Sequence, residues 1–421
     1  MTTVREADDA TAAFAGLPYV TELRSGEALS QRLGIAVEPT RIRVKPGRSA
    51  IVSWVREEKG RLGEDQDWGW SAVVTGADKL ANIRRRAAAR NETVTVHECS
   101  EPRSAGATGS VLISGSVRAD SKLEKEIARA TRELTGVDDQ SGELEMIGYN
   151  PGRRVLLKHT RRESGACEFV RIGTGSQQHL VETAALWADW SLPTLPVEAL
   201  GSRGTAVRSP WWGVGDLETQ PEMGMAEEVG VIIAELHRHT PAEVGHRARV
   251  SPLEQAAETA TVVAQLLPEV GSAVAAIVRT LHHRLGFEIG TGAGGRGEAG
   301  SGDRAIHGDL SPDQVLVGHS ECRIIDLDRA GVGPTGMDLG RWVAACRQRA
   351  DAQARILETG FLDGYRSAGG ADVDVEAWAA WAMLVTALEP WRTCRADWRR
   401  ATLQIIGAAQ DSLAASRNRV S

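Results

Sequence analysis

The chain has 421 residues, of which 42% are hydrophobic and 25% charged, so it has the composition of a globular protein with two or three separately packed domains. The formal net charge of −7 and the isoelectric point near 5.9 argue against nucleic acid as a partner.

The cysteines and the apolar segments indicate the compartment. The five cysteines are scattered, odd in number and without a C-x-x-C pair, which predicts reduced thiols rather than a disulfide framework or structural zinc. Residues 1–17 lack the apolar core of a signal peptide, and no run approaches the roughly 20 apolar residues that span a bilayer. We therefore expect a cytoplasmic protein without a membrane partner.

The first predicted elements form a faint repeat. Segments 43–54 (RVKPGRSAIVSW) and 148–159 (GYNPGRRVLLKH) align with an offset of 105 residues, the difference between 151 and 46. Each reads as a Pro-Gly turn, an Arg and an apolar strand, because Pro sets the first corner of a turn and Gly accepts a positive φ at the second. The repeat predicts a duplicated β-rich unit.

The two copies continue differently. After the first, the strand 68–74 is followed by no basic residue at the matching place, and the helix 77–90 is rich in Arg. Its run Arg84–Arg86 is either a solvated helix face or a docking surface for an acidic protein partner. After the second, the pattern predicts a strand at 167–172 and a helix at 178–190.

From residue 219 onward the apolar residues recur at helical spacing. This predicts helices at 226–239, 252–265 and 273–285 and amphipathic helix over most of 352–416.

Between these helical parts lies a predicted hairpin. Residues 306–328 read IHGDLSPDQVLVGHSECRIIDLD, with a short apolar strand at 314–317 and a second at 323–325. Asp309 lies in the loop before the first strand, and Asp326 ends the second. Because the strands lie side by side, both aspartates can face one cleft.

These residue types suit magnesium-dependent phosphoryl transfer, which requires positioned charge and oriented oxygens. Asp309 is predicted to orient the acceptor hydroxyl and accept its proton, and His307 to brace the loop. Asp326 and Gln314 supply the hard oxygen ligands that Mg²⁺ prefers. Asp328 either assists a second metal ion or caps the turn.

The set resembles a known family. The motif H-x-D-x-x-x-x-Q at 307–314, followed by I-I-D at 324–326, resembles the catalytic and metal-binding loops of the aminoglycoside phosphotransferase family, relatives of protein kinases. The helix at 226–239 and the tail RAGVGPTGMDLG also look like this family, in which an aspartate at the place of Asp338 props up the catalytic loop. The resemblance is dense only over 305–340.

The resemblance implies an α+β, protein-kinase-like bilobal fold, with a small β-rich lobe, a large helical lobe and an extra amino-terminal α+β domain. Residues 1–140 are then an accessory domain, interpreted as a degenerate repeat of the small lobe. Residues 141–218 form the small lobe and hinge, and residues 219–421 form the helical lobe with the catalytic and metal-binding loops.

The family also implies cofactor-binding residues in the small lobe. A family lysine pairs with the nucleotide phosphates and with a glutamate on the next helix; the matching residues here are Arg171 and Glu182. Lys158 is the alternative cation, and Arg171 is otherwise a solvated strand residue. Arg for Lys is a departure, because guanidinium is a planar fork rather than a point charge.

A second departure is Gln314, where the family usually has Asn. Gln carries the same amide oxygen on a stem one methylene longer, and maltokinase-like members of the superfamily have Gln there.

Three functions are left open. The first is an ATP- and Mg²⁺-dependent kinase, with GTP open as donor, that acts on a hydroxyl of a small molecule such as an aminoglycoside-like antibiotic or a sugar. The second is a kinase for Ser or Thr in a precursor peptide. The third is a catalytically inactive binding or scaffold protein. A protein partner of the amino-terminal domain is compatible with each.

Overall fold

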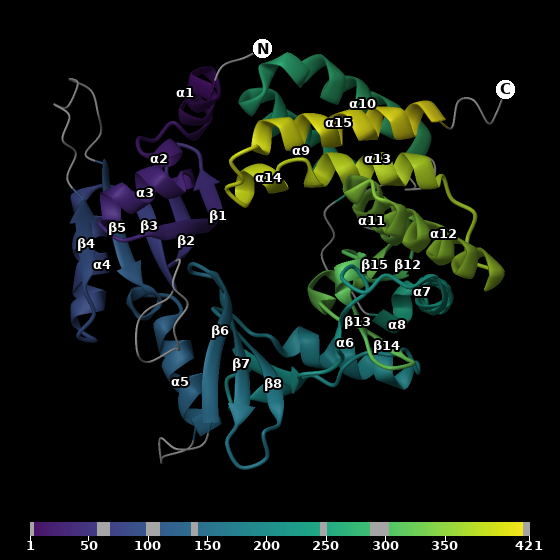
Figure 1. Ribbon diagram of the computed structural model, residues 1–421, viewed down its shortest axis with the longest axis horizontal. Helices are drawn as coiled ribbons and strands as arrows, with labels where there is room; N and C mark the ends of the chain where they lie inside the picture. The colour runs from purple at the N-terminus through teal and green to yellow at the C-terminus, as the bar shows by residue number, and fades with distance from the viewer. Residues whose placement is uncertain are drawn as a thin grey trace. The chain divides into compact units, whose positions relative to one another are not determined.

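The computed structural model describes residues 4–56, 68–97, 110–135, 142–244, 251–286 and 303–415 (Figure 1). The chain forms two compact units. The first contains Met1–Val181, Val197–Trp211 and Glu389–Arg399, and the second contains Glu182–Pro196, Trp212–Leu388 and Arg400–Ser421. Two five-stranded sheets lie in the first unit, and the second is mostly helical, so the predicted α+β class is confirmed.

The first sheet is antiparallel throughout, with the strand order β1-β2-β3-β5-β4. Its strands are β1 (Val37–Lys45), β2 (Ser49–Arg56), β3 (Trp68–Thr75), β4 (Val94–His97) and β5 (Ser110–Ser116). Three helices precede it, and one helix connects β3 to β4. These helices are α1 (Val4–Ala15), α2 (Val20–Arg24), α3 (Gly26–Leu33) and α4 (Ala77–Ala88).

The second sheet repeats this topology, with the order β6-β7-β8-β10-β9. Its strands are β6 (Gly142–Asn150), β7 (Arg154–Arg161), β8 (Cys167–Gly173), β9 (Glu198–Leu200) and β10 (Ala206–Pro210), and α6 (Gln178–Asp189) connects β8 to β9. The bounds of β6 and β7 equal those of β1 and β2 shifted by 105 residues. This agreement in order and spacing is what a duplicated unit predicts.

One apolar core joins the two sheets. The first sheet contributes its buried side chains Trp70, Ala72 and Val74 to the same cluster as Val155 and Leu157 of the second sheet. Helix α5 (Glu124–Thr135), which connects the sheets in sequence, adds two further side chains, Ile127 and Ala130. Burial of aliphatic and aromatic side chains contributes about 1.5–3 kcal/mol each, so this shared core holds the repeats together.

The segment Glu389–Arg399, which contains α14 (Glu389–Arg392), packs within the first unit. The guanidinium of Arg24 lies 5.1 Å from the ring centroids of both Trp391 and Trp398. Arg24 Nε also donates to the main-chain oxygen of Trp391 at 3.1 Å. A cation between two aromatic faces, with a buried hydrogen bond, fixes this segment on α2.

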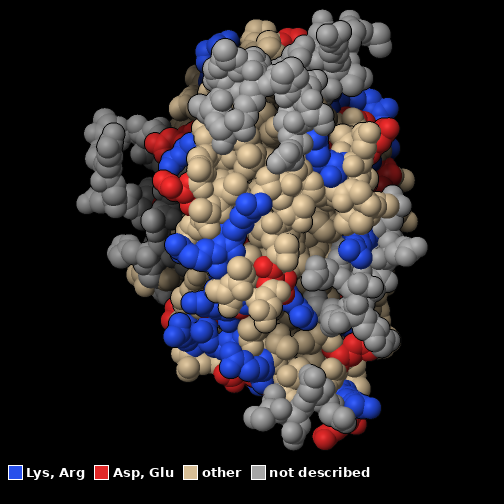
Figure 2. Space-filling model, turned by 90° about the vertical axis from the view of Figure 1, so that its left-hand side faces the viewer, with Lys and Arg blue, Asp and Glu red and all other residues tan. Residues whose placement is uncertain are grey.

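Helix α4 presents basic residues to solvent. Arg84, Arg85 and Arg86 are exposed, and Arg85 Nη2 donates to Asn82 Oδ1 at 2.9 Å. Lys and Arg side chains gather on the face of the molecule turned to the viewer in Figure 2. A solvated helix face accounts for Arg84, Arg85 and Arg86, and a docking role for them stays a prediction.

The second unit is built from helices that approach closely at glycines. A Cβ at Gly364 of α12 (Ala352–Ser367) would collide with the carbonyl oxygen of Glu227 on α7 (Met223–Leu236). A Cβ at Gly340 of α11 (Gly336–Arg349) would collide with the main chain of Trp378 on α13 (Val375–Thr386). The remaining helices are α8 (Pro241–Val244), α9 (Pro252–Leu266), α10 (Gly271–Leu285) and α15 (Trp398–Ala415).

Short strands flank the loops that contain Asp309 and Asp326. β12 (Asp303–Ile306) pairs with β15 (Gly331–Pro334), and the predicted hairpin is present as β13 (Val315–Val317) paired with β14 (Cys322–Ile324). β11 (Gly215–Asp216) pairs with β13 on its other side. Within the described parts of the chain, no helix has both the length and the apolar character needed to cross a membrane.

Candidate active site

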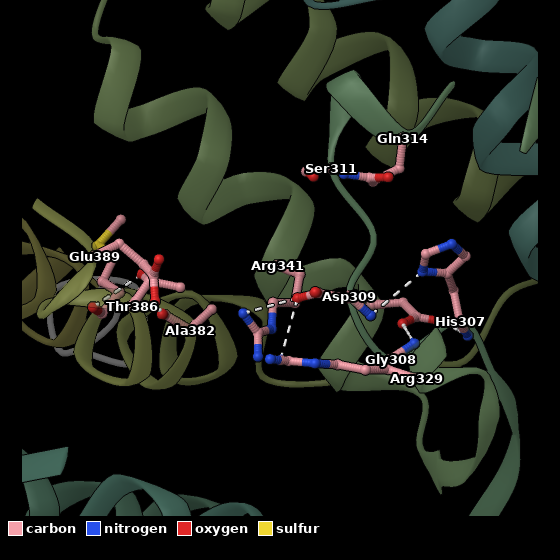
Figure 3. Close-up of polar contacts among 12 residues, drawn as sticks. His307, Gly308, Asp309, Ser311, Gln314, Arg329, Arg341, Ala382, Thr386 and Glu389 are labelled. Atoms are coloured by element: carbon pink, nitrogen blue, oxygen red, sulfur yellow. Dashed lines mark hydrogen bonds and ion pairs between the residues drawn. The ribbon is translucent and has the colours of Figure 1, made fainter. Parts of the chain in front are cut away.

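Asp309 lies in the loop that follows β12, directly after Gly308, whose φ of +81° favours glycine. Two guanidinium groups converge on its Oδ1: Arg341 Nη1 at 3.1 Å and Arg329 Nη1 at 3.3 Å (Figure 3). Arg341 projects from α11, where it lies 5.2 Å from the ring centroid of Trp381. These contacts give the Asp309 carboxylate a defined orientation.

Asp338 on α11 holds the loop that carries Asp309. Its Oδ2 accepts from the main-chain N–H of His307 at 2.8 Å, and its Oδ1 accepts from that of Gly308 at 2.7 Å. Oδ2 also accepts from His237 Nε2 at 3.1 Å. The propping contacts that the family resemblance implies for Asp338 are therefore present.

The charge of Asp338 persists although its side chain has no exposed surface. Burial on its own raises the pKa of a carboxyl group. Here the hydrogen bond from His237 and the main-chain N–H of His307 outweigh burial, so the pKa of Asp338 lies below its usual range. Burial raises the pKa of Tyr365 to about 12. Its hydroxyl therefore stays protonated and donates to His237 Nδ1 at 2.9 Å, which leaves Nε2–H to donate to Asp338.

His307 connects the loop of Asp309 to that of Asp326. Its Nδ1 accepts from the N–H of Asp309 at 3.3 Å, so the proton of the ring lies on Nε2. Nε2 then donates to the main-chain oxygen of Ile325 at 2.8 Å. The contacts are those that a bracing role requires, and they hold one residue on each side of the hairpin.

Gln314 lies at the end of the short helix η3 (Pro312–Gln314) and does not open the strand as predicted, because β13 begins at Val315. Its main-chain oxygen still accepts from Ile325 N at 3.0 Å, so it belongs to the hairpin ladder. Its side-chain Nε2 donates to Asp313 Oδ2 at 2.8 Å, so metal ligation by its amide oxygen stays a prediction that this contact does not oppose. In Figure 3 its side chain is drawn beside Ser311.

Asp326 follows β14 in a left-handed conformation, with φ 57° and ψ 58°. Non-glycine residues seldom adopt this conformation outside turns and functional sites. Asp326 is half-buried, as is Asp328 in the next turn, η4 (Leu327–Arg329).

These donors suit Mg²⁺. Two carboxylates and one amide oxygen are hard ligands, and Mg²⁺ in kinases completes its shell with phosphate and water oxygens. Among the described residues, no cluster of three or more His, Cys, Asp or Glu forms a metal cage.

The predicted phosphate-binding residues occupy the second sheet and α6. Arg171 on β8 donates from Nε to Oε1 of the buried Gln177 at 2.9 Å. Lys158 on β7 places its ammonium 4.7 Å from the ring centroid of Trp211. Glu182 lies on the exposed side of α6, and its pairing with Arg171 stays a prediction. Gln177 was not predicted from the sequence, because nothing in the sequence around a glutamine between a strand and a helix indicates which residue it binds.

In the first sheet, the places that match Lys158 and Arg171 hold no basic residue. The shift of 105 residues relates Lys158 to Ser53, and the strand registers Ser49↔Val74 and Arg154↔Gly173 relate Arg171 to Ala72. Ser53 and Ala72 are buried, and Ala72 belongs to the core shared with the second sheet. Small buried residues at both places support the interpretation of a degenerate repeat.

The family model described as the phosphotransferase enzyme family (APH) matches residues 210–371. This range contains α7, the loop of Asp309, the hairpin and α11. A search of curated proteins finds no match for the chain.

Several solved structures resemble this chain at low identity. Spectinomycin phosphotransferase APH(9)-Ia, in complex with ADP and spectinomycin, is 13% identical, covering 68% of this chain and 98% of its own, with a TM-score of 0.48. Choline kinase from Cryptosporidium parvum Iowa II is 11% identical, covering 70% and 97%, with a TM-score of 0.49. Aminoglycoside phosphotransferase APH(3'')-Id from Streptomyces rimosus is 15% identical, covering 62% and 97%, with a TM-score of 0.44.

The family model thus agrees with the resemblance expected from the motifs at 305–340. Over residues 210–371 this chain is similar to the phosphotransferase enzyme family, and its fold is of the α+β class.

Proposed function

We propose that this protein is an ATP- and Mg²⁺-dependent phosphotransferase that transfers the γ-phosphoryl group to a hydroxyl group of a small molecule. The observation that carries the proposal is the braced loop: Asp338 fixes the N–H groups of His307 and Gly308, and Arg329 and Arg341 orient Asp309. A rigid loop that presents one oriented carboxylate is what in-line phosphoryl transfer requires of a protein.

In the proposed reaction, Asp309 accepts a hydrogen bond from the acceptor hydroxyl and aligns its oxygen with the γ-phosphorus. The new O–P bond forms as the bond from the γ-phosphorus to the bridging oxygen breaks, ADP leaves, and the hydroxyl proton passes to the carboxylate of Asp309. Arg329 and Arg341 hold the carboxylate throughout and offset its charge beside the phosphates.

Asp326 and the amide oxygen of Gln314 would hold Mg²⁺, with Asp328 as a further carboxylate in the same turn. When bound, the ion offsets the negative charge of the β- and γ-phosphates. Arg171, Lys158 and Glu182 are proposed to act on the nucleotide from the second sheet and α6. The turn between β6 and β7 has the place of the loop that covers the phosphates in protein kinases, because it joins the first two strands of this sheet.

A thermal-shift measurement with ATP, in the presence and absence of Mg²⁺, tests the proposal. We expect Mg²⁺ with ATP to raise the melting temperature by about 5 °C at a hundredfold excess over Kd, because a ligand stabilises the state that binds it. Asp326→Asn should abolish the Mg²⁺-dependent part of the shift. Asp309→Asn should keep the shift and lose transfer to any acceptor found by an ADP-release screen of antibiotics, sugars and peptides.

The two variants serve as controls for each other, since each replaces a loop carboxylate by its isosteric amide. A wild-type protein that shows no shift in either condition would instead be a non-catalytic scaffold. Phosphorylation of peptides but of no small molecule in the screen would transfer the assignment to a peptide acceptor.

A further inference from the structure

The turn that joins β6 and β7 is held in place by two side chains from outside the hairpin, Asp120 and Arg43. Gly152 has a φ of +64° and donates its N–H to Asp120 Oδ2 at 2.5 Å. Tyr149, at the end of β6, donates its hydroxyl to the same oxygen at 2.9 Å. The carboxylate also accepts from Lys122 N at 3.0 Å through Oδ1. Hydrogen bonds to an ionised group are roughly twice as strong as neutral ones.

The first repeat reaches this turn as well. Arg43 on β1 donates from Nη2 to the main-chain oxygen of Pro151 at 3.0 Å. Pro151 itself is buried, although a Pro-Gly turn at the tip of a hairpin is normally exposed. The turn is therefore enclosed by Asp120 and Tyr149 together with a guanidinium from the other sheet.

The duplicated turn provides an internal comparison. In the first repeat, the equivalent amide, that of Gly47, donates to the main-chain oxygen of Ala15 at 2.8 Å. Ala15 and Asp120 are themselves 105 residues apart, so the same place in each repeat holds the turn. Pro46 and Gly47 are nevertheless exposed. In the second repeat the neutral carbonyl has been replaced by a buried carboxylate, and the contacts from Tyr149 and Arg43 have been added.

The contacts of Asp120, Tyr149 and Arg43 with the turn form what we call the clamp. The hydrogen bonding of Asp120 and the protonation of Tyr149 both favour its persistence. Asp120 is buried and yet has donors on both oxygens, as a buried carboxylate requires. Burial raises the pKa of Tyr149 well above its ordinary value, so its hydroxyl keeps the proton that it donates. Thr174 N, which follows β8, donates to the oxygen of Arg153 at 3.0 Å and ties the far side of the turn to the strand that carries Arg171.

We propose that Asp120 is a positioning residue for the nucleotide. Together with Tyr149 and Arg43, it holds the Pro151-Gly152 turn in the conformation that covers the ATP phosphates, so the amino-terminal repeat acts as a fixed support for the nucleotide site. This inference rests on the proposed function only in identifying ATP as the molecule beneath the turn. Protein kinases cover the phosphates with a mobile glycine-rich loop, whereas in this chain the proposed covering turn is held in place by hydrogen bonds.

The first measurement tests the clamp without any nucleotide. Hydrogen–deuterium exchange of the full-length protein should show faster exchange in a peptide covering residues 148–156 for Asp120→Ala than for wild type. Tyr149→Phe keeps the buried ring and removes one donor, so it should give a smaller increase and remain folded if Asp120→Ala does not. Unchanged exchange in both variants would overturn the clamp itself.

The second measurement is the affinity for ATP with Mg²⁺ by isothermal titration calorimetry. Loss of the carboxylate should raise Kd about tenfold, since a hydrogen bond to a charged group contributes about that factor. A purely structural role would lower the melting temperature and leave the Kd of the folded protein unchanged. The matched control is Arg48→Ala in the exposed turn of the first repeat, which should alter neither exchange at 148–156 nor Kd.

The outcomes separate the two proposals. If wild type binds ATP and the Asp120 and Tyr149 variants bind it equally well, the positioning role is wrong and the proposed function stands. If wild type binds no ATP, the proposed function fails, and with it the nucleotide role of the turn, while the exchange data still report on the clamp.

Discussion

Asp338 is a charged group without exposed surface that remains ionised because three N–H groups point at it. Two of these belong to the main chain of the loop that carries Asp309. The stability of the helical unit and the geometry of the loop are therefore linked through one side chain.

Asp338→Asn is expected to destabilise the protein by about 2 kcal/mol at neutral pH, because one amide N–H would face a main-chain N–H. The lowered pKa means that, between the folded and unfolded values, the unfolded chain binds more protons. The contribution of Asp338 is thus complete above its ordinary value of 3.8 and is lost as the pH falls through the folded value. Urea unfolding of both proteins from neutral pH down to about pH 3 measures this.

The matched control is Asp363→Asn on α12, which removes an exposed carboxylate that pairs with Arg366. Exposed ion pairs contribute about 0–1 kcal/mol, so this variant should follow wild type throughout. A difference between wild type and Asp338→Asn that grows as the pH falls would contradict the assigned direction.

At the residue scale, sequence reasoning found the groups that a motif carries and missed their partners. Asp309 and Asp326 could be named as candidates because two short apolar strands follow each other at hairpin spacing. Asp309 lies in the loop before the first strand, and Asp326 ends the second. Arg341 was not, because it reaches Asp309 only through the way α11 packs, and an Arg on a helix carries no signal of its target. Arg329, three residues after Asp326, lay within the motif and could have been named.

Helices pack closely where one of them has a glycine, which has no side chain, at the contact. Helices α7 and α12 approach so near that Gly364 faces the carbonyl oxygen of Glu227, and Gly230 faces the main chain of Phe361 and Tyr365. The same pair of helices brings His237, just after α7, to Tyr365 on α12. The close contact therefore sets the position of a ring that donates to Asp338.

Gly364→Ala should destabilise the protein by about 1–3 kcal/mol, because the added Cβ meets rigid main chain and the helices must separate. Gly407→Ala on α15 is the control: its added Cβ meets nothing within 4 Å, and Ala is the better helix former. We expect the control to be neutral or stabilised by up to about 1 kcal/mol. Thermal unfolding of the two variants measures the contrast, and equal melting temperatures would show that α7 can shift freely.

Element positions followed well from apolar periodicity. The strand and helix predicted at 167–172 and 178–190 are β8 and α6 to within a residue at their ends, and the helix predicted at 252–265 is α9. The start of the hairpin was wrong by one residue, because Pro312 favours a helical turn that includes Gln314. Helix ends of this kind depend on turn chemistry rather than on period.

At the scale of the whole molecule, the cysteines are distributed between buried cores and one accessible strand. Cys322, Cys346 and Cys394 are buried, and burial raises the pKa of each thiol to about 12. Cys167, at the start of β8, is half-exposed. Because the thiolate is the reactive form, thiols with such a high pKa are inert near neutral pH.

In a Cys99→Ser background, which removes the cysteine outside the described residues, iodoacetamide should modify Cys167 alone in the native protein and all four remaining cysteines after denaturation. Intact-mass spectrometry reads out the adducts. Cys167→Ser in the same background should leave the native protein unmodified, and native labelling of Cys346 would contradict the burial.

The large-scale organisation was only partly accessible to sequence reasoning. The repeat was visible because Pro-Gly turns recur at a fixed offset, and the shared sheet order agrees with it. The joint core of the two sheets was not predictable, because the sequence of an apolar strand does not indicate which other surface it packs against. Nor did any pattern indicate that Glu389–Arg399 would pack with the first unit. The division at residues 140 and 218 stays a prediction.

The placement of that last segment has a consequence for synthesis. Arg24 and the Trp391 carbonyl oxygen that it binds are 367 positions apart, and Trp398 lies still later. In a chain that emerges from the ribosome, Arg24 appears 367 residues before Trp391, when neither indole has been made. The contact between Arg24 and this segment can therefore form only after Trp391 and Trp398 have been synthesised, so this part of the first unit closes late in folding.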